Sequence, residues 1–513
     1  MGRYESDTFV LKMIGHRGKP SSLNLTVAAH VDVLARERAS RGLSAVLGAG
    51  VLLLGVAMAA GAQEPPASVP PPVPASQQPG ADAQVHTGTS SGVDADTRLQ
   101  NLLADHQFLR LERELDQLPP DEAEFYRGLL ANRSNDAAKS IALLEPLVEK
   151  VAASGNTARE KLLRKALAED YLRQGDWAKA AAAYQTLETR LGAKLTPDEQ
   201  DELELPVKLL PLAASNPPMT VEPCDPFVMQ VEKNPLGLID VPVFVDAQPH
   251  AWMLDPTAPF NLMARSLAKE VGIKIGEQVA TIRSLTGKPI KVHVATVPRF
   301  TIAGKLTLRN MTVFVFEDAD YNFPKSRYQV EGVLGYPAVS ALGSLTITAD
   351  DTIFVRPGKQ VADVAKDDRL TSGARFFLDG DQVVVALGRL RENSTDSKSG
   401  DEQMYVIDAG SQQTYLTSRY FGEHESEFAA QHMELFSVPG SQDLAPQPAY
   451  TAETVPLVVG ATTARVHYVQ VLTQPLGSAA LDDVYGVLGV DVLDQLASYT
   501  FDYRTMQFGV KAR

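Results

Sequence analysis

The spacing of apolar side chains changes along the chain and divides it into regions. Residues 43–62 form an uncharged apolar run, whereas residues 63–95 are dominated by Pro, Ser, Gln and Gly and are predicted to be an extended linker. Across residues 96–215 the apolar positions recur with the period of a helix. From about residue 225 to the C-terminus they alternate over short runs separated by Gly and Asp, as strands and turns do. The pattern predicts a multidomain α + β protein, in which a helical domain precedes an all-β region.

Two segments of the helical region, residues 124–150 and 166–190, have similar patterns. In the second segment, Gly175 and Asp176 are expected to form a turn between two helices. Asp136 and Asp176 stand 40 residues apart, and each is followed by an Ala-Lys pair at the same distance. The region 96–215 resembles tetratricopeptide (TPR) repeats with a longer period than usual. A generic helical hairpin domain is the alternative, and both interpretations imply a scaffold that binds a protein partner.

The β region contains an internal duplication of about 154 residues. Each copy has an apolar strand that ends in an aspartate, in WMLDPTA at Asp255 and in MYVIDAG at Asp408. Each copy also has a Gly-Val-Leu-Gly run, which ends at Gly335 in the first copy and at Gly489 in the second. The distance from the aspartate to this last glycine is 80 residues in the first copy and 81 in the second. This agreement predicts two lobes of the same fold.

The duplicated region resembles the pepsin and retropepsin superfamily of aspartic peptidases, and within it the bacterial retropepsin-like proteins with two lobes in one chain. The resemblance implies lobes at residues 225–357 and 370–513, with one catalytic aspartate each, Asp255 and Asp408. Two carboxylates held close together share one proton, because like charges at that distance cannot both ionise. One carboxylate then activates a water while the protonated one polarises the scissile carbonyl. The implied function is an endopeptidase that hydrolyses peptide bonds.

The same resemblance assigns roles to four glycines, two in loop support and two in flaps. Gly335 and Gly489 are expected to lie behind the aspartate loops and support them. Gly287 and Gly440 are expected in hairpins that occupy the place of the family's substrate-covering flaps.

The two loops depart from the family's Asp-Thr/Ser-Gly pattern. Pro256 and Ala409 stand where the family has a hydroxyl residue that locks the loops together, and Thr257 replaces the glycine that Gly410 retains. A catalytically degenerate pseudo-protease, which binds extended peptides or envelope partners between its lobes, is therefore the second hypothesis. The predicted active-site loops consist of Pro256, Thr257 and Ala258 in the first lobe and Ala409, Gly410 and Ser411 in the second.

The apolar run at residues 43–62 predicts that residues 1–62 are a signal peptide or an N-terminal anchor and that the protein is exported. Arg36, Arg38 and Arg41 precede the run, and Ala-Gly-Ala at residues 60–62 fits a signal-peptide cleavage site after Ala62. The expected location is periplasmic or secreted. The run is also long enough to span a bilayer, so an uncleaved anchor of the inner membrane is the alternative.

Composition restricts the remaining chemistry. The 513 residues carry a net charge of −15, which disfavours nucleic acid as a partner. The lone cysteine, Cys224, excludes an internal disulfide framework and a multi-cysteine metal site. The nine histidines are scattered, and the sequence has neither an HExxH motif nor a phosphate-binding glycine loop. We therefore expect no metal and no cofactor.

Overall fold

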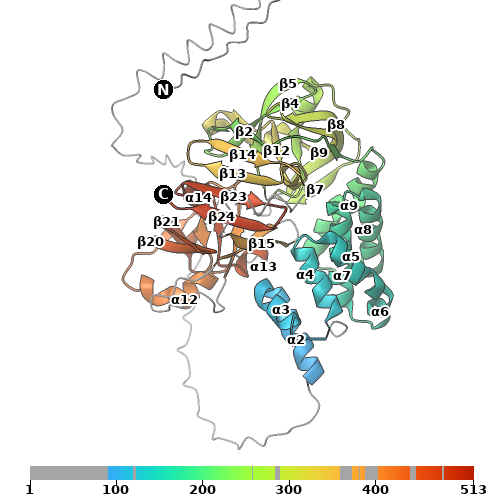
Figure 1. Cartoon of the computed structure of the whole chain (residues 1–513), viewed down its shortest axis with the longest axis vertical. Helices are drawn as coiled ribbons and strands as arrows, with labels where there is room; N and C mark the ends of the chain where they lie inside the picture. The colour runs from blue at the N-terminus through green and yellow to red at the C-terminus, as the bar shows by residue number, and fades with distance from the viewer. Residues whose placement is uncertain are drawn as a thin grey trace, which may run out of the picture. The chain divides into compact units, whose positions relative to one another are not determined.

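The computed structural model (Figure 1) shows helices followed by a β region of several sheets, so the predicted order of α before β is confirmed. Among the described residues no helix is long and apolar enough to cross a membrane. The apolar run at residues 43–62 lies outside them. The structure describes residues 91–119, 123–256, 258–283, 289–358, 373–379, 382–387, 403–438, 446–476 and 479–513.

The helical region consists of short helices joined by tight turns. Its first helix begins at Ser91, within the segment predicted as linker. Asp136 and Asp176 each cap a helix, because their side chains accept a hydrogen bond from the backbone N–H of Lys139 at 3.2 Å and of Lys179 at 3.1 Å. The repeated Asp and Lys thus mark the same structural position twice. The helices are α2 (Ser91–Ala104), α3 (Phe108–Leu115), α4 (Glu124–Arg133), α5 (Ala137–Leu144), α6 (Val148–Ala153), α7 (Thr157–Arg173), α8 (Trp177–Leu191) and α9 (Pro197–Ala214).

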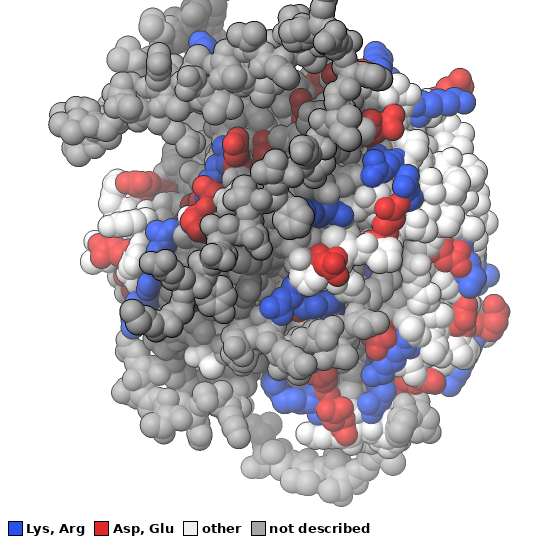
Figure 2. All heavy atoms as spheres, turned by 45° about the horizontal axis from the view of Figure 1, so that its top comes forward, with Lys and Arg blue, Asp and Glu red and all other residues white. Residues whose placement is uncertain are grey.

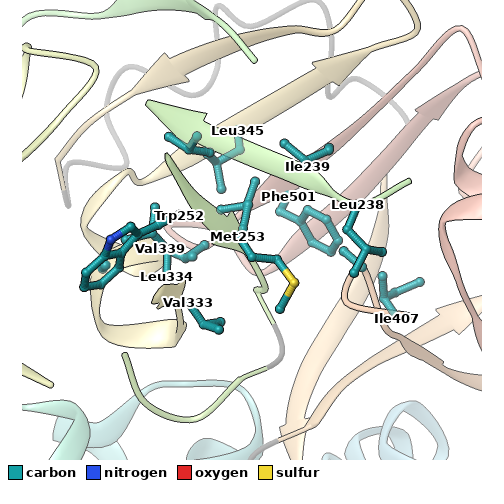
Figure 3. Close-up of a cluster of buried hydrophobic side chains, with 14 of the residues drawn as sticks. Leu238, Ile239, Trp252, Met253, Val333, Leu334, Val339, Leu345, Ile407 and Phe501 are labelled. Atoms are coloured by element: carbon teal, nitrogen blue, oxygen red, sulfur yellow. The ribbon is translucent and has the colours of Figure 1, made fainter. Parts of the chain in front are cut away.

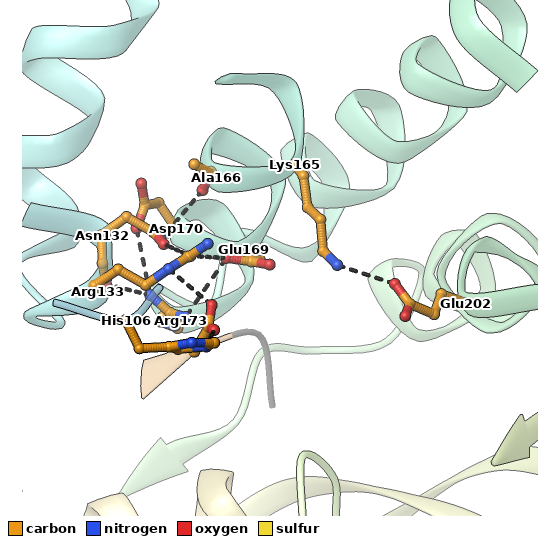
Figure 4. A network of polar contacts seen from close by, with 10 residues as sticks. His106, Asn132, Arg133, Lys165, Ala166, Glu169, Asp170, Arg173 and Glu202 are labelled. Atoms are coloured by element: carbon orange, nitrogen blue, oxygen red, sulfur yellow. Dashed lines mark hydrogen bonds and ion pairs between the residues drawn. The ribbon is translucent and has the colours of Figure 1, made fainter. Parts of the chain in front are cut away.

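A buried polar network crosses the helical region and reaches the β region (Figure 4). The Asn132 amide donates to the Asp170 carboxylate at 2.9 Å and to the carbonyl oxygen of Ala166 at 3.1 Å. Arg133 forms ion pairs with Glu169 at 3.4 Å and with Asp379 of the β region at 2.9 Å. Buried charges are tolerated when they are paired in this way, so the network ties the helices to one another and to the β region.

The first lobe, here called lobe 1, is built on a sheet in the order β1-β9-β6-β12-β5-β4-β8-β7, with β8 also paired to β9 and β3 to β4. Its strands are β1 (Thr220–Val221), β2 (Phe227–Gln230), β3 (Glu232–Lys233), β4 (Ile239–Val245), β5 (Gln248–Leu254), β6 (Leu262–Ala264), β7 (Ala280–Arg283), β8 (Pro289–Ile302), β9 (Leu306–Phe316), β10 (Asn322–Phe323), β11 (Tyr328–Gln329), β12 (Gly332–Leu334), β13 (Ser344–Thr348) and β14 (Thr352–Arg356). Its helices are α10 (Arg265–Glu270) and α11 (Tyr336–Ala341).

The second lobe, lobe 2, continues into a sheet shared with lobe 1, in the order β19-β20-β21-β18-β22-β17-β16-β15-β24-β23-β13-β14-β2. Its strands are β15 (Ala374–Asp379), β16 (Gln382–Leu387), β17 (Gln403–Ile407), β18 (Tyr415–Leu416), β19 (Glu434–Phe436), β20 (Gln447–Val459), β21 (Thr462–Leu472), β22 (Gly486–Leu488), β23 (Ser498–Asp502) and β24 (Gln507–Lys511). Its helices are α12 (Ser418–Phe428), α13 (Ala479–Asp482) and α14 (Val490–Leu493).

One hydrophobic core runs through both lobes, and part of it is shown in Figure 3. Trp252 and Leu334 of lobe 1 belong to the same buried cluster as Ile407 and Phe501 of lobe 2. Trp252 is fully buried, and its indole lies so close to Gly332 that any side chain at that position would collide with it. The shared core holds the ends of β5 and β17 in a fixed relation, because close-packed side chains resist displacement.

Charged side chains of both signs are interspersed over the described part of the face shown in Figure 2. Neither the positive nor the negative side chains gather into a separate patch among the described residues of this face.

Candidate active site

Asp255 and Asp408 occupy equivalent positions at the ends of two buried strands. Asp255 follows β5 and Asp408 follows β17. Beside each lies a parallel strand, β12 beside β5 and β22 beside β17. The backbone N–H of Asp255 donates to the carbonyl oxygen of Leu334 at 3.1 Å, and that of Asp408 donates to Leu488 at 2.9 Å. The duplicated Gly-Val-Leu runs thus fix the point at which each aspartate leaves its strand.

The two loops are closed by matching backbone hydrogen bonds. The N–H of Ala258 donates to the carbonyl oxygen of Asp255 at 3.2 Å, and the N–H of Ser411 donates to that of Asp408 at 3.1 Å. Each carboxylate is also oriented by its own loop. Ala258 N–H lies 3.2 Å from Asp255 Oδ1, and Gly410 N–H lies 3.0 Å from Asp408 Oδ1. Hydrogen bonds to a carboxylate stabilise its ionised form and restrict its rotation.

Gly335 and Gly489 lie against the backbone of the two loops. A Cβ on Gly489 would lie 2.8 Å from the carbonyl oxygen of Gln413 and 3.0 Å from that of Ser411. A Cβ on Gly335 would collide with the carbonyl oxygen of Phe260 and lie 2.8 Å from that of Ala258. Both positions therefore require glycine because the backbone of the loop approaches so closely.

Two polar side chains that the sequence analysis did not single out hold these glycines. The N–H of Gly335 donates to Asn261 Oδ1 at 3.1 Å, and the N–H of Gly489 donates to Thr414 Oγ1 at 2.8 Å. Asn261 and Thr414 are both buried and follow their aspartates at the same distance along the chain. Comparison of the two copies residue by residue would have found them, although their residue types differ.

Gly410 brings the two aspartates together. A Cβ on Gly410 would lie 2.7 Å from Asp255 Oδ2 and 3.3 Å from Asp408 Oδ1. Both carboxylates therefore border the same small volume, and the absence of a side chain at Gly410 leaves space for the Asp255 carboxylate of the other lobe. In the sequence, only the duplication indicated that Asp255 and the loop of Asp408 lie close together.

The surroundings of the pair disfavour ionisation of Asp408. Burial and then the negative charge of Asp255 raise the pKa of Asp408 well above its ordinary range, against the opposing effect of the N–H groups of Gly410 and Ser411. Tyr321 and Tyr415 lie close enough to the pair for its charge to act on them. Burial raises the pKa of each phenol, with a further contribution from Asp255 at Tyr321 and from Asp408 at Tyr415.

The positions of the missing hydroxyl residues are buried. Pro256 is buried, and Ala409 is only 4% exposed. Neither side chain has a hydroxyl to donate across to the other loop. Three further predicted site residues lie outside the described residues: Thr257, Gly287 and Gly440.

No group of His, Cys, Asp or Glu side chains that could hold a metal ion is found among the described residues.

Residues 241–338 match the model of a family described as aspartyl protease. The match runs from β4 into α11 and contains both the Asp255 loop and Gly335, so the resemblance to aspartic peptidases is confirmed for this segment of lobe 1. A search of curated proteins gave no match to the sequence.

Two seed proteins are among the similar solved structures. Basic 7S globulin from soybean is 14% identical, with 56% of this chain and 95% of that chain covered and a TM-score of 0.36. Conglutin gamma, a unique basic 7S globulin from lupine seeds, is 10% identical, with 57% and 96% covered and a TM-score of 0.36.

Proposed function

We propose that the chain is an aspartic endopeptidase whose catalytic residues are Asp255 and Asp408. The observation that carries the proposal is that both carboxylates border the space at Gly410. Support comes from the two loops, which are closed by the same hydrogen bonds in both lobes, and from the match of residues 241–338 to the aspartyl protease family. Two unrelated aspartates in turns would not be expected to bring their carboxylates to the same side of Gly410.

In the proposed mechanism the pair holds one proton. Burial and the charge of Asp255 favour that proton on Asp408, which then donates a hydrogen bond to the scissile carbonyl oxygen. Asp255 accepts a proton from the attacking water. The two groups titrate as a pair, so activity is expected on the acidic side of neutrality.

A second function, non-catalytic binding of extended peptides, is favoured by Pro256 and Ala409. Without the loop-locking hydroxyls the carboxylates are less firmly positioned, and a displacement of about 1 Å can reduce a rate on the order of 10²-fold. Binding of an extended peptide by strand-like pairing needs less precise positioning of the two carboxylates than hydrolysis does, so it persists where turnover is lost.

The helical region and the N-terminus complete the proposal. We assign the TPR-like helices at residues 96–215 the role of a scaffold for a protein partner or substrate. We assign the apolar run at residues 43–62 the role of an export signal, cleaved after Ala62, that directs the protein to the periplasm or the medium of a bacterium. An uncleaved anchor would keep the same domains at the outer face of the inner membrane.

The test incubates the purified chain with an unbiased peptide library from about pH 3 to 8, a range that brackets the titration of a carboxylate pair. Asp255→Asn and Asp408→Asn are compared with Asp246→Asn, an exposed turn residue at the end of β4. We expect cleavage that disappears in the first two variants and persists in the third. Cleavage that survives either loop substitution would contradict the dyad. A folded chain that cleaves nothing would favour the peptide-binding function.

A further inference from the structure

A short turn of the helical region contacts both lobes. The turn lies at the end of α4 and consists of Arg133, the last residue of that helix, together with Ser134 and Asn135. Asn135 Oδ1 accepts a hydrogen bond from the hydroxyl of Tyr336 in lobe 1 at 3.1 Å. Arg133 is paired with Asp379 of lobe 2 at 2.9 Å. We call residues 133–135 the interlobe turn.

On the lobe 1 side, the interlobe turn reaches the support of the Asp255 loop. Tyr336 is the first residue after Gly335, and its backbone N–H closes the loop by donating to the carbonyl oxygen of Ala258 at 2.7 Å. Its side chain lies between the two lobes, with its ring centroid 5.8 Å from that of Tyr503 in lobe 2. Burial raises the pKa of the Tyr336 phenol, so this hydroxyl remains a hydrogen-bond donor throughout the ordinary pH range.

On the lobe 2 side, the interlobe turn holds β15. Asp379, the last residue of β15, is paired with Arg133 and also with His106 in the turn that follows α2. The guanidinium of Arg375, on the same strand, donates to the hydroxyl of Ser134 at 3.3 Å. Although burial alone would raise the pKa of Asp379, the charges of Arg133 and His106 hold it well below its usual range. The contact therefore remains charged at the acidic pH where the dyad is expected to work.

We propose that the interlobe turn positions the catalytic pair, with Asn135 and Tyr336 as positioning residues. The inference rests on the proposed peptidase function. In the family that the β region resembles, hydroxyl residues lock the two loops to each other, and Pro256 and Ala409 lack that group. The interlobe turn contacts the same two lobes through residues that are not part of the loops. Tyr336, which bonds to Asn135, directly follows Gly335, the glycine that lies against the Asp255 loop. The helical region is thereby part of the active site's framework as well as a scaffold.

The variants are chosen to remove one contact without disturbing the backbone. Asn135 has φ of 59°, so Asn135→Gly deletes its side chain at a position where glycine adopts the backbone without strain. Tyr336→Phe deletes only the hydroxyl. Tyr171→Phe is the matched control, because its hydroxyl donates to Glu145, which also belongs to the helical region.

Two readouts separate positioning from a merely structural role. The first is cleavage of a peptide by the full chain, for which we expect kcat to fall about 10-fold or more with KM nearly unchanged in Asn135→Gly and Tyr336→Phe. The second is the carboxyl carbon-13 NMR titration of Asp408, assigned with Asp408→Asn. Its midpoint should move down by about one pH unit, because a loosened pair admits water and weakens the effect of Asp255.

The outcomes distinguish this inference from the proposed function. The titration does not require turnover, so it decides the positioning role even if the wild-type chain cleaves nothing. Unchanged titration midpoints in folded Asn135→Gly and Tyr336→Phe would overturn the role of the interlobe turn, whether or not the chain is a peptidase. Equal effects in Tyr171→Phe would show that any loss of packing in the helices is sufficient, and would also overturn it.

Discussion

Thr346 of β13 and Thr500 of β23 face each other across the two lobes, with their hydroxyl oxygens 2.9 Å apart. They stand 154 residues apart in the sequence, which is the length of the internal repeat, so they are the same position in the two copies. The register on either side of them is symmetric, because Leu345 pairs with Phe501 and Ile347 pairs with Tyr499. This pair fixes the lobes to each other through a shared sheet, at a place separate from the aspartate loops.

The threonine pair should contribute to stability as a unit. Thr346→Val or Thr500→Val alone leaves a buried hydroxyl unpaired, which is expected to cost about 1–3 kcal/mol, whereas the double variant should cost less than the sum of the two. Urea unfolding of the four proteins measures the coupling. The pair Thr301 and Thr307, 3.3 Å apart within lobe 1, is the control and should show weaker coupling. Additive effects at Thr346 and Thr500 would contradict the contact.

The glycines behind the loops should not tolerate a methyl group. Gly335→Ala and Gly489→Ala force a Cβ against loop carbonyl oxygens, so we expect a loss of about 2 kcal/mol or more and loss of cleavage. Gly422→Ala is the control, because a Cβ there meets nothing within 4 Å and the residue lies inside α12. That variant should be stabilised by about 0.5–1 kcal/mol. Unfolding curves that rank the three variants otherwise would refute the loop geometry.

The raised pKa of Asp408 predicts a pH dependence of stability. The folded chain holds this proton more tightly than the unfolded chain, so stability should fall as the pH rises from about 4 through the higher pKa of the folded state. Asp408→Asn removes the ionisation and should lose less stability over that range. Unfolding at about pH 4.5 and 8 measures the difference. Exposed Asp246→Asn should behave like wild type; identical slopes in all three proteins would exclude a raised pKa.

The ion pair at Asp379 should contribute more to stability than a surface ion pair. Asp379→Asn leaves the charge of Arg133 partly unpaired in a site where Arg133 is 12% and Asp379 27% exposed, and is expected to cost about 1–3 kcal/mol at neutral pH. Because the pKa of the folded state is lowered, this contribution is present above about pH 4 and is lost below it. Glu222→Gln breaks an exposed pair with Arg309 and should cost less than about 1 kcal/mol. Similar losses in the two variants would contradict a buried network.

The sequence by itself determined the order of the regions and the equivalence of the two aspartates. The change from helical to alternating periodicity separates α from β, since each period matches one backbone geometry. The repeated spacing from aspartate to glycine identified Asp255, Asp408, Gly335 and Gly489 as matching positions, because a duplicated fold needs the same chain length between the same contacts.

Only the tertiary structure decided which residues act across the lobes. The approach of Asp255 to Gly410, the pairing of Thr346 with Thr500 and the reach of Asn135 to Tyr336 join residues far apart in the chain. No local pattern encodes such contacts, because periodicity reports which face of an element is buried and not which partner covers it. The framework that holds the aspartates together is therefore a property of packing between regions, even though each aspartate is marked in its own strand.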